Sequence, residues 1–413
     1  MEKDVRALAR KMSKNSRSHI FIRIINKIKL LSTSFWAIPL VLIIRKLKPY
    51  CLVRFGIIDS TRIGHFNAQS VMYWTSLQEQ PINTVDLFWF SEKVSNRQWE
   101  RMARRKLKIH WSVYYLDHWN KKISGGQDHI LKPTTRDIQG KLKQMNVIPF
   151  EFLPEEVAQA KDWLRAQGWK DHEKFVCLLV RDSSYLQISP LLKNENWDYH
   201  SYRDTDISDY VPAVEWLAGQ GIWVLRMGSV MAKPIPTNHS RVIDYAFHPN
   251  KNELLDIWLF ANCDLCISTG SGLDSITEFY NKPILFVNFI PLSHIWSWCD
   301  SLNIPKHLFW KTTGKALTWR EHLKYNYART DDYEKAGIIV KDLSSDEILD
   351  ATKECWQRVE DNWVDSLEDI QRQKKFWEIL KEWPDYSKRH DWIHPKCRIG
   401  ATWLKSNKYD FLI

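Results

Sequence analysis

The sequence is poor in cysteine, and its cysteines follow no regular spacing. Seven are scattered among 413 residues, and an odd number without paired spacing is not typical of a disulfide framework. This excludes small disulfide-stabilised secreted proteins and predicts a reducing compartment, the cytoplasm. Cys263 and Cys266 form a CxxC pair, but they lie in a run typical of a buried strand, with no second Cys or His pair near. Core packing is therefore favoured over a zinc site.

The sequence also lacks an apolar run long enough to span a membrane. The run at 30–44 has fifteen residues, whereas a spanning helix needs about 20. No small-residue cleavage site of a signal peptide follows it, because the chain continues with basic residues. Basic residues on both sides of a short apolar run are typical of an interfacial anchor on an anionic membrane surface. We predict that residues 1–48 form such a membrane-surface segment on the cytoplasmic side; the alternative is a helix packed on the body of the protein.

Outside that segment the chain has no excess of charge. Residues 1–50 contain twelve Lys and Arg against two acidic residues, which accounts for the whole formal net charge of +10. The other 363 residues contain 47 basic and 47 acidic side chains. A nucleic-acid-binding surface needs a basic excess on the folded body, so nucleic acid is not an expected partner.

From residue 51 onward, short apolar runs alternate with amphipathic stretches, a pattern that predicts βαβ units and parallel sheets. In the first series we expect strands at 51–55, 84–90 and 107–111, and helices at 68–77, 95–106, 136–145 and 155–167. In the second series we expect strands at 175–180, 223–226, 242–245, 265–268 and 284–287, and helices at 207–218, 253–260 and 273–280.

These two series predict two Rossmann-like α/β domains, residues 49–165 and 166–343, that face a cleft. Ligands in such folds bind where the carboxyl ends of the strands meet the crevice. Residues 344–413 are helical in pattern, charged and rich in Trp. We predict that they form a C-terminal extension that packs back on the N-terminal domain.

The clearest candidate site is the segment 263–278, where a predicted strand is followed by a turn and a helix. Glycines at 270 and 272 permit a tight turn, and the free amides at a helix start attract phosphate. Asp274 and Glu278 share one helix face, so that one of them could accept hydrogen bonds from ribose hydroxyls. The turn matches neither a P-loop nor GxGxxG. The alternative is an ordinary strand-to-helix turn in which Asp274 caps the helix.

A second loop follows the first strand and carries Arg62, Gly64 and His65. A histidine with a pKa near neutrality could take a proton from an acceptor hydroxyl or hydrogen-bond a departing phosphate. Gly64 would allow a ligand to approach closely. The alternative for His65 is a solvated or capping residue.

Arginines occur at loop positions of the second series, at Arg181, Arg203 and Arg226. Three guanidinium groups around one sheet edge would neutralise a diphosphate leaving group in the absence of a metal. The run 204–206 (DTD) could instead be a metal-binding DxD motif, or Asp206 could cap the following helix. A metal is therefore not expected, although the sequence leaves it open.

Several stretches together resemble a bacterial family of glycosyltransferases associated with surface-polysaccharide biosynthesis. They are RIGH at 62–65, YRDTDISDY at 202–210, VLRMGS at 224–229, ISTGSGLDSITEF at 267–279, KPILFVN at 282–288 and RIGATWLKSN at 398–407. The resemblance implies a GT-B architecture, with a nucleotide-sugar donor mainly on 166–343, an acceptor mainly on 49–165 and no essential metal or other cofactor.

The resulting assignment is a glycosyltransferase that moves a sugar from a nucleotide-sugar donor to a lipid-linked or surface-polysaccharide acceptor at the membrane surface. The catalytic candidates are His65 and Arg62. The donor-binding candidates are Arg181, Arg203, Arg226, Gly228, Thr269, Gly270, Ser271, Gly272, Asp274 and Glu278. The alternatives are a nucleotide-sugar epimerase and a non-catalytic, membrane-tethered subunit of a polysaccharide assembly complex.

Overall fold

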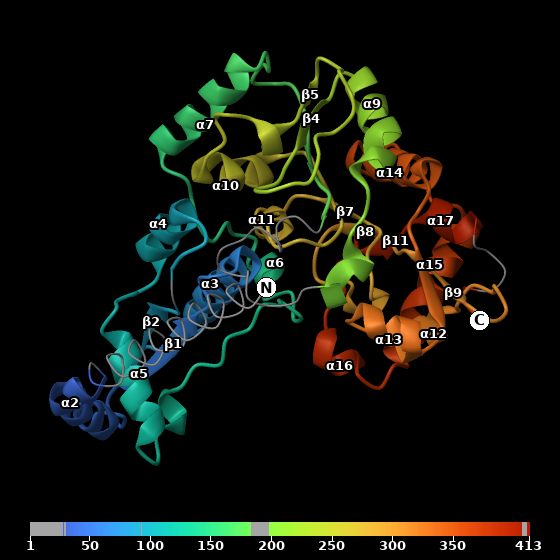
Figure 1. Cartoon of the computed structure of the whole chain (residues 1–413). Helices are drawn as coiled ribbons and strands as arrows, with labels where there is room; N and C mark the ends of the chain where they lie inside the picture. Colours follow the sequence, from blue (N-terminus) through green and yellow to red (C-terminus); the bar gives the residue numbers. More distant parts are fainter. Residues whose placement is uncertain (1–27, 29, 92, 183–197, 407–410) are drawn as a thin grey trace, which may run out of the picture.

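The computed structural model describes residues 28, 30–91, 93–182, 198–406 and 411–413. Residues 1–27 and 29 of the predicted membrane-surface segment lie outside this described part. Within it, the chain forms two parallel sheets and one small antiparallel sheet, surrounded by helices (Figure 1). The predicted α/β class, with parallel sheets in both halves and helices at the C-terminal end, is confirmed.

The smaller parallel sheet belongs to the N-terminal half. It consists of β1 (Leu52–Ile58) and β2 (Thr84–Phe90), which are joined by α3 (Ile63–Gln78). Single bridges at Ile109 and Ile130 continue it on either side, so the strand predicted at 107–111 is reduced to one bridge. The other helices of this half are α2 (Ser34–Lys46), α4 (Arg97–Lys106), α5 (Val113–Lys122), α6 (Lys141–Met145) and α7 (Pro154–Ala166).

The helix predicted at 136–145 begins only at Lys141, the first residue of α6. Gly140 precedes it with a φ of +64°, a left-handed conformation that suits glycine. The carboxylate of Asp137 accepts hydrogen bonds from the amides of Lys141 and Leu142, both at 2.9 Å. The residues before Gly140 therefore form a loop, which brings Arg136 to the cavity described below.

The larger parallel sheet belongs to the C-terminal half, and its described strands follow the order β11-β8-β7-β6-β3-β4-β5. They are β3 (Phe175–Leu179), β4 (Trp223–Arg226), β5 (Val242–Ile243), β6 (Leu265–Ser268), β7 (Ile284–Val287), β8 (Ser301–Ile304) and β11 (Arg398–Ile399). From β3 the chain adds strands outward to β5, and from β6 it adds them in the opposite direction. β3 and β6 therefore flank a topological switch point, the place where open α/β sheets bind ligands.

Helices cover both faces of this sheet, so its central strands are buried throughout. The covering helices are α9 (Val211–Gly219), α10 (Glu253–Asn262), α11 (Asp274–Phe279), α14 (Ser345–Val359), α15 (Leu367–Lys381) and α17 (Ala401–Ser406). α10 and α11 pack on the face that carries Cys177, and α9 and α14 pack on the face that carries Leu178. Phe66 of α3 and Trp99 of α4 belong to the first of these clusters. The two halves therefore share one continuous apolar core.

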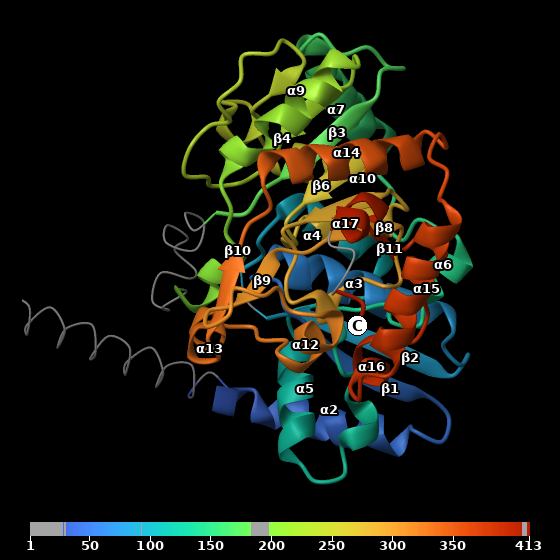
Figure 2. The same ribbon diagram turned by 90° about the vertical axis from the view of Figure 1, so that its right-hand side faces the viewer.

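The C-terminal extension packs mainly on the larger sheet, contrary to the prediction that it covers the N-terminal domain. α14 contacts α9 and β7, and Figure 2 shows it crossing the face of the large sheet. Phe376 of α15 stacks on Trp319 with ring centroids 4.7 Å apart. The apolar sides of α14 and α15 complete the core on this face of the large sheet, which would otherwise be exposed. The segment near Trp392 reaches the first half, where the amide of Trp392 donates to the carbonyl of Ile138 at 2.8 Å.

The remaining elements form a small lobe and a short helix in the C-terminal half. They are β9 (His307–Trp310), α12 (Trp319–Lys324), α13 (Thr330–Lys335), β10 (Ile338–Lys341) and α16 (Tyr386–Arg389). β9 and β10 pair antiparallel, and they pack around the buried side chain of Tyr333.

α2 lies beside α5 at the end of the N-terminal half farthest from α7 and α9 (Figures 1 and 2). Its side toward α5 buries Ala37, Val41 and Ile44. The opposite side leaves Phe35 78% and Ile43 54% exposed. No helix among the described residues is both long and apolar enough to cross a membrane.

Candidate functional site

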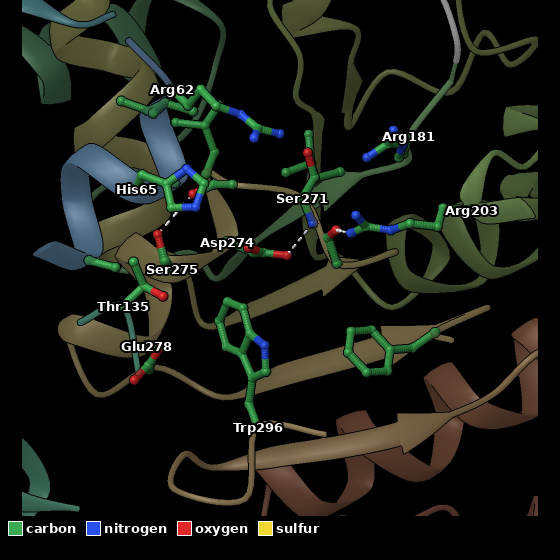
Figure 3. Close-up of a pocket in the computed structure, with 18 of the residues that line it drawn as sticks. Arg62, His65, Thr135, Arg181, Arg203, Ser271, Asp274, Ser275, Glu278 and Trp296 are labelled. Atoms are coloured by element: carbon green, nitrogen blue, oxygen red, sulfur yellow. Dashed lines mark hydrogen bonds between the residues drawn. The ribbon is translucent and has the colours of Figure 1, made fainter. Parts of the chain in front are cut away.

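A cavity of about 500 Å³ lies at the switch point, between the two halves of the protein. Its walls are the loops after β3, β6 and β7, the start of α3 and the loop before α6. Figure 3 shows Arg62 and His65 on one side of it, Arg181 and Arg203 on the other, and Ser271 between them. The cleft expected between two α/β halves is therefore present at the carboxyl ends of the strands.

Most of the predicted site residues come together in this cavity. Those that line it are Arg62, His65, Arg181, Arg203, Gly228, Gly270, Ser271, Gly272, Asp274 and Glu278. Thr269 does not line it, because its hydroxyl accepts a hydrogen bond from the amide of Arg181 at 3.0 Å. That bond ties the ends of β3 and β6 together.

Arg226 is the second predicted donor-binding residue that lies outside the cavity lining. It ends β4, and its side chain is buried in the sheet with 1% exposure. Its Nη1 donates to Asp244 at 3.3 Å, and its guanidinium lies over the ring of Phe247. Burial lowers the pKa of Arg226. This arginine is therefore a buried partner of Asp244, and the prediction that it contacts the donor is corrected.

The glycine turn has a packing role between the two halves that the sequence did not reveal. A Cβ built on Gly272 would lie 2.8 Å from the backbone nitrogen of Gly64, and one built on Gly64 would lie 2.8 Å from the Cα of Gly272. Real Cβ atoms do not approach so closely, so the two backbones require glycine at both positions. The start of α3 and the turn after β6 are thereby held in contact.

Two amides of the turn, those of Gly270 and Ser271, are occupied by side chains, so the expectation that the amides of the turn are free for phosphate is corrected for these two. The amide of Ser271 donates to the carboxylate of Asp274 at 2.7 Å, and the amide of Gly270 donates to the hydroxyl of Ser268 at 3.1 Å. The Ser268 hydroxyl donates in turn to the same carboxylate at 2.7 Å. Burial raises the pKa of Asp274 to about 6. Near pH 7 a negative charge therefore sits at the turn, and an anion must be attracted by other groups.

Two guanidinium groups supply that attraction beside the turn. Arg181 donates through Nε to Asp204 at 3.1 Å, while its buried Nη2 has no hydrogen-bond partner among the described residues. Arg203 donates through Nη2 to the carbonyl of Gly270. Burial lowers the pKa of Arg203, and the nearby charge of Arg181 lowers it further. Two such charges in one wall favour a ligand with more than one negative charge.

The DTD run at 204–206 serves local structure. Asp206 accepts from the amide of Ser208 at 2.8 Å and so caps the short helix that follows, which confirms the capping alternative. Asp204 pairs with Arg181. Among the described residues no group of three or more His, Cys, Asp or Glu side chains could hold a metal ion.

His65 lies on the first turn of α3, opposite the arginines. Its Nδ1 is 3.7 Å from the carboxylate of Asp59, which also accepts from the hydroxyl of Thr61 at 2.7 Å. Burial lowers the pKa of His65, the charge of Arg62 lowers it further, and Asp59 opposes them. The imidazole is therefore neutral near pH 7 and able to accept a proton. Asp59 is a polar residue directly after β1, a position at which it could have been noticed in the sequence.

Glu278 lines the cavity but has a partner inside the protein. Its carboxylate accepts from the indole nitrogen of Trp298 at 2.6 Å, and burial raises its pKa to about 8. It is therefore mostly protonated near pH 7. Asp274 and Glu278 both reach the cavity, as their spacing predicted, although neither is a free carboxylate there.

The structure adds residues that the sequence did not single out. Arg136 and His294 line the cavity together with Trp296. Arg136 lay inside a stretch predicted to be helical, and His294 follows β7 without a recognisable motif. Nothing in the local pattern pointed to either residue.

No protein-family model matches the sequence, and no curated protein matches it. Solved structures resemble it in shape. The glycosyl transferase family 9 structure from Veillonella parvula is 9% identical, covers 62% of this chain and 86% of that one, and has a TM-score of 0.40. The E. coli ADP-heptose LPS heptosyltransferase II is 10% identical, with coverages of 61% and 90% and a TM-score of 0.38.

A third structure, an E. coli heptosyltransferase with ADP, is also 10% identical, with coverages of 61% and 91% and a TM-score of 0.33. With identities of 10% or less and TM-scores of 0.40 or less, these likenesses do not assign a function to this chain.

Proposed function

We propose that the chain is a glycosyltransferase that moves a sugar from a nucleotide-sugar donor to a glycan or lipid-linked acceptor. The observation that carries the proposal is the pair of guanidinium groups of Arg181 and Arg203 at the switch point, facing His65 across one cavity. A departing diphosphate requires such fixed positive charge. The opposite wall offers a neutral imidazole to the group that attacks.

In the proposed reaction, the acceptor hydroxyl oxygen forms a bond to the anomeric carbon of the sugar, and the bond from that carbon to the diphosphate oxygen breaks. His65 accepts the hydroxyl proton and becomes an imidazolium, which Asp59 stabilises from 3.7 Å. Arg181 and Arg203 neutralise the diphosphate as it leaves. The Gly64 and Gly272 contact keeps the two walls in place.

The test is to incubate the purified protein with a panel of nucleotide sugars and acceptor glycans and to measure the released nucleoside diphosphate. Arg181→Gln should weaken binding of the nucleoside diphosphate at least about tenfold, or about 1.4 kcal/mol, as measured by calorimetry. Arg320→Gln is the matched control, because Arg320 is exposed and pairs with Glu382 on the surface.

The outcomes separate the alternatives. Conversion of the donor sugar without an acceptor would indicate a nucleotide-sugar epimerase. If no nucleotide or nucleotide sugar stabilises the folded protein, the glycosyltransferase proposal fails and a non-catalytic subunit is favoured.

We also propose that the outer face of α2 lies on an anionic membrane surface. This face exposes the apolar residues Phe35, Leu42 and Ile43 to solvent, and the helix ends in the basic residues Arg45 and Lys46. Arg45 is held to the α5 end by hydrogen bonds to Asn120. An apolar strip flanked by basic residues is typical of interfacial binding.

Vesicles that contain anionic lipid should sediment the full-length protein, and the double change Phe35→Ser with Leu42→Ser should release it. The control is Val364→Ser with Leu367→Ser, which removes two apolar residues that are exposed elsewhere, by 89% and 79%. Equal sedimentation of both double variants would contradict the proposal.

A further inference from the structure

A second basic group lines the cavity in addition to Arg181 and Arg203. Arg136 enters from the loop before α6, and His294 enters from the segment after β7. The two residues come from different halves of the protein. His294 lies close enough to Arg203 for the charge of that arginine to affect it, so the second group adjoins the donor arginines.

Arg136 carries a charge that nothing described in the structure compensates. Its buried Nη1 has no hydrogen-bond partner among the described residues. Burial and the neighbouring charge of Arg389 lower its pKa to about 10, so it stays cationic near pH 7. The nearest carboxylate in sequence, Asp137, is engaged with the amides of Lys141 and Leu142.

The surroundings of Arg136 are basic rather than acidic. Burial, followed by the charges of Arg389, Arg136 and His390, lowers the pKa of His294 to about 3. His390 is buried, hydrogen-bonds Ser297 and the carbonyl of Ser293, and has a pKa near 4. Both histidines are therefore neutral near pH 7. Arg136, which lines the cavity, and its neighbour Arg389 form no ion pair among the described residues.

A partly buried cation with a buried, unpartnered nitrogen is costly unless a ligand supplies a counter-charge. We propose that Arg136, supported by Arg389 and flanked by His294, binds an anionic group of the acceptor, a carboxylate or a phosphate. The inference rests on the proposed function, since it assigns this site to the acceptor and the Arg181 and Arg203 site to the donor. The acceptor is accordingly an acidic or phosphorylated glycan.

The experiment measures binding of small acidic probes to the full-length protein in the presence of a saturating nucleoside diphosphate. The probes are glucuronic acid for the carboxylate and glucose 1-phosphate for the phosphate, with glucose as the neutral control. The acidic probes should bind, and glucose should bind at least tenfold more weakly. Whichever acidic probe binds tighter identifies the anionic group.

Arg136→Gln should reduce the affinity for the acidic probes at least tenfold and leave nucleoside diphosphate affinity within twofold. Arg136→Lys should restore part of the loss, and Arg181→Gln should weaken only the nucleotide. Without ligand, Arg136→Gln should unfold at the same or a higher temperature, because it removes an uncompensated charge. Equal binding of acidic probes by wild type and Arg136→Gln would overturn the inference.

A second measurement uses the unchanged protein, so it does not depend on the folding of a variant. Phenylglyoxal modifies accessible guanidinium groups, and peptide mass analysis reads the modification of Arg136. The tighter acidic probe should protect Arg136, and glucose should not. Lack of protection would overturn the inference. Failure of the proposed function would give a different result: the protein would not bind the nucleoside diphosphate, although the acidic probe would still protect Arg136.

Discussion

Replacing Asp274 with Asn tests whether a buried carboxylate controls the glycine turn. The side chain is fully buried, and its Oδ2 accepts from the Ser271 amide and the Ser268 hydroxyl, both at 2.7 Å. Its Oδ1 has no partner among the described residues. The amide oxygen of Asn can take the position of Oδ2 and keep both hydrogen bonds. Asp274→Asn therefore removes the charge and places an NH2 group at the position of Oδ1, a change whose cost does not vary with pH.

The size of the effect follows from the pKa of Asp274, which burial raises from 3.8 to about 6. The folded state holds the proton more tightly than the unfolded state, so the stabilisation is complete below about pH 4 and is lost as the pH rises through about 6. Between about pH 4.5 and about pH 6.5 the wild type should lose about 2 kcal/mol relative to the variant, which does not titrate there.

The assay is urea unfolding of both proteins at several pH values, followed by tryptophan fluorescence. The difference in the free energy of unfolding should shift by about 2 kcal/mol in favour of Asp274→Asn over this interval. Ser268→Ala retains the carboxylate but removes a hydrogen bond that lowers its pKa, so the pH dependence should persist and move to higher pH. A difference that stays constant with pH would refute the argument that the carboxylate is buried and charged near neutrality.

Two further changes test the contact between the halves and the environment of His65. Gly272→Ala should lower the free energy of unfolding by about 1–3 kcal/mol, because its Cβ would lie 2.8 Å from the backbone of Gly64. The control Gly219→Ala, whose Cβ would meet no atom within 4 Å, should be neutral. Equal effects of the two changes would contradict the packing argument. Asp59→Asn should lower the pKa of His65, because Asp59 raises it. NMR titration of the imidazole would show this, and an unchanged titration would mean that Asp59 does not reach the ring.

Where a buried strand is a short apolar run between turn residues, the sequence is sufficient to locate it. The predictions at 84–90, 223–226, 265–268 and 284–287 coincide with β2, β4, β6 and β7. The positions of the site loops follow from this, because loops at the carboxyl ends of parallel strands share one edge of the sheet.

Strands whose pairing depends on distant residues were not predicted. β8 includes Ser301 and Asn303 and therefore lacks a continuous apolar pattern. The side-chain amide of Asn303 donates to the hydroxyl of Ser301 at 3.0 Å and to the carbonyl of Arg398 at 3.2 Å, so one of its two partners lies on β11. Local periodicity carries no information on such a partner.

The sequence by itself determined the α/β class, most of the strands and the loops that approach the cavity. Tertiary structure alone decided that Asp274 accepts from the amide of Ser271, that Arg226 is buried beside Asp244 and that Arg136 reaches the cavity from the other half. The direction of a side chain and the neutralisation of its charge depend on contacts between segments far apart in the chain. Those contacts exist only when the shared core has formed.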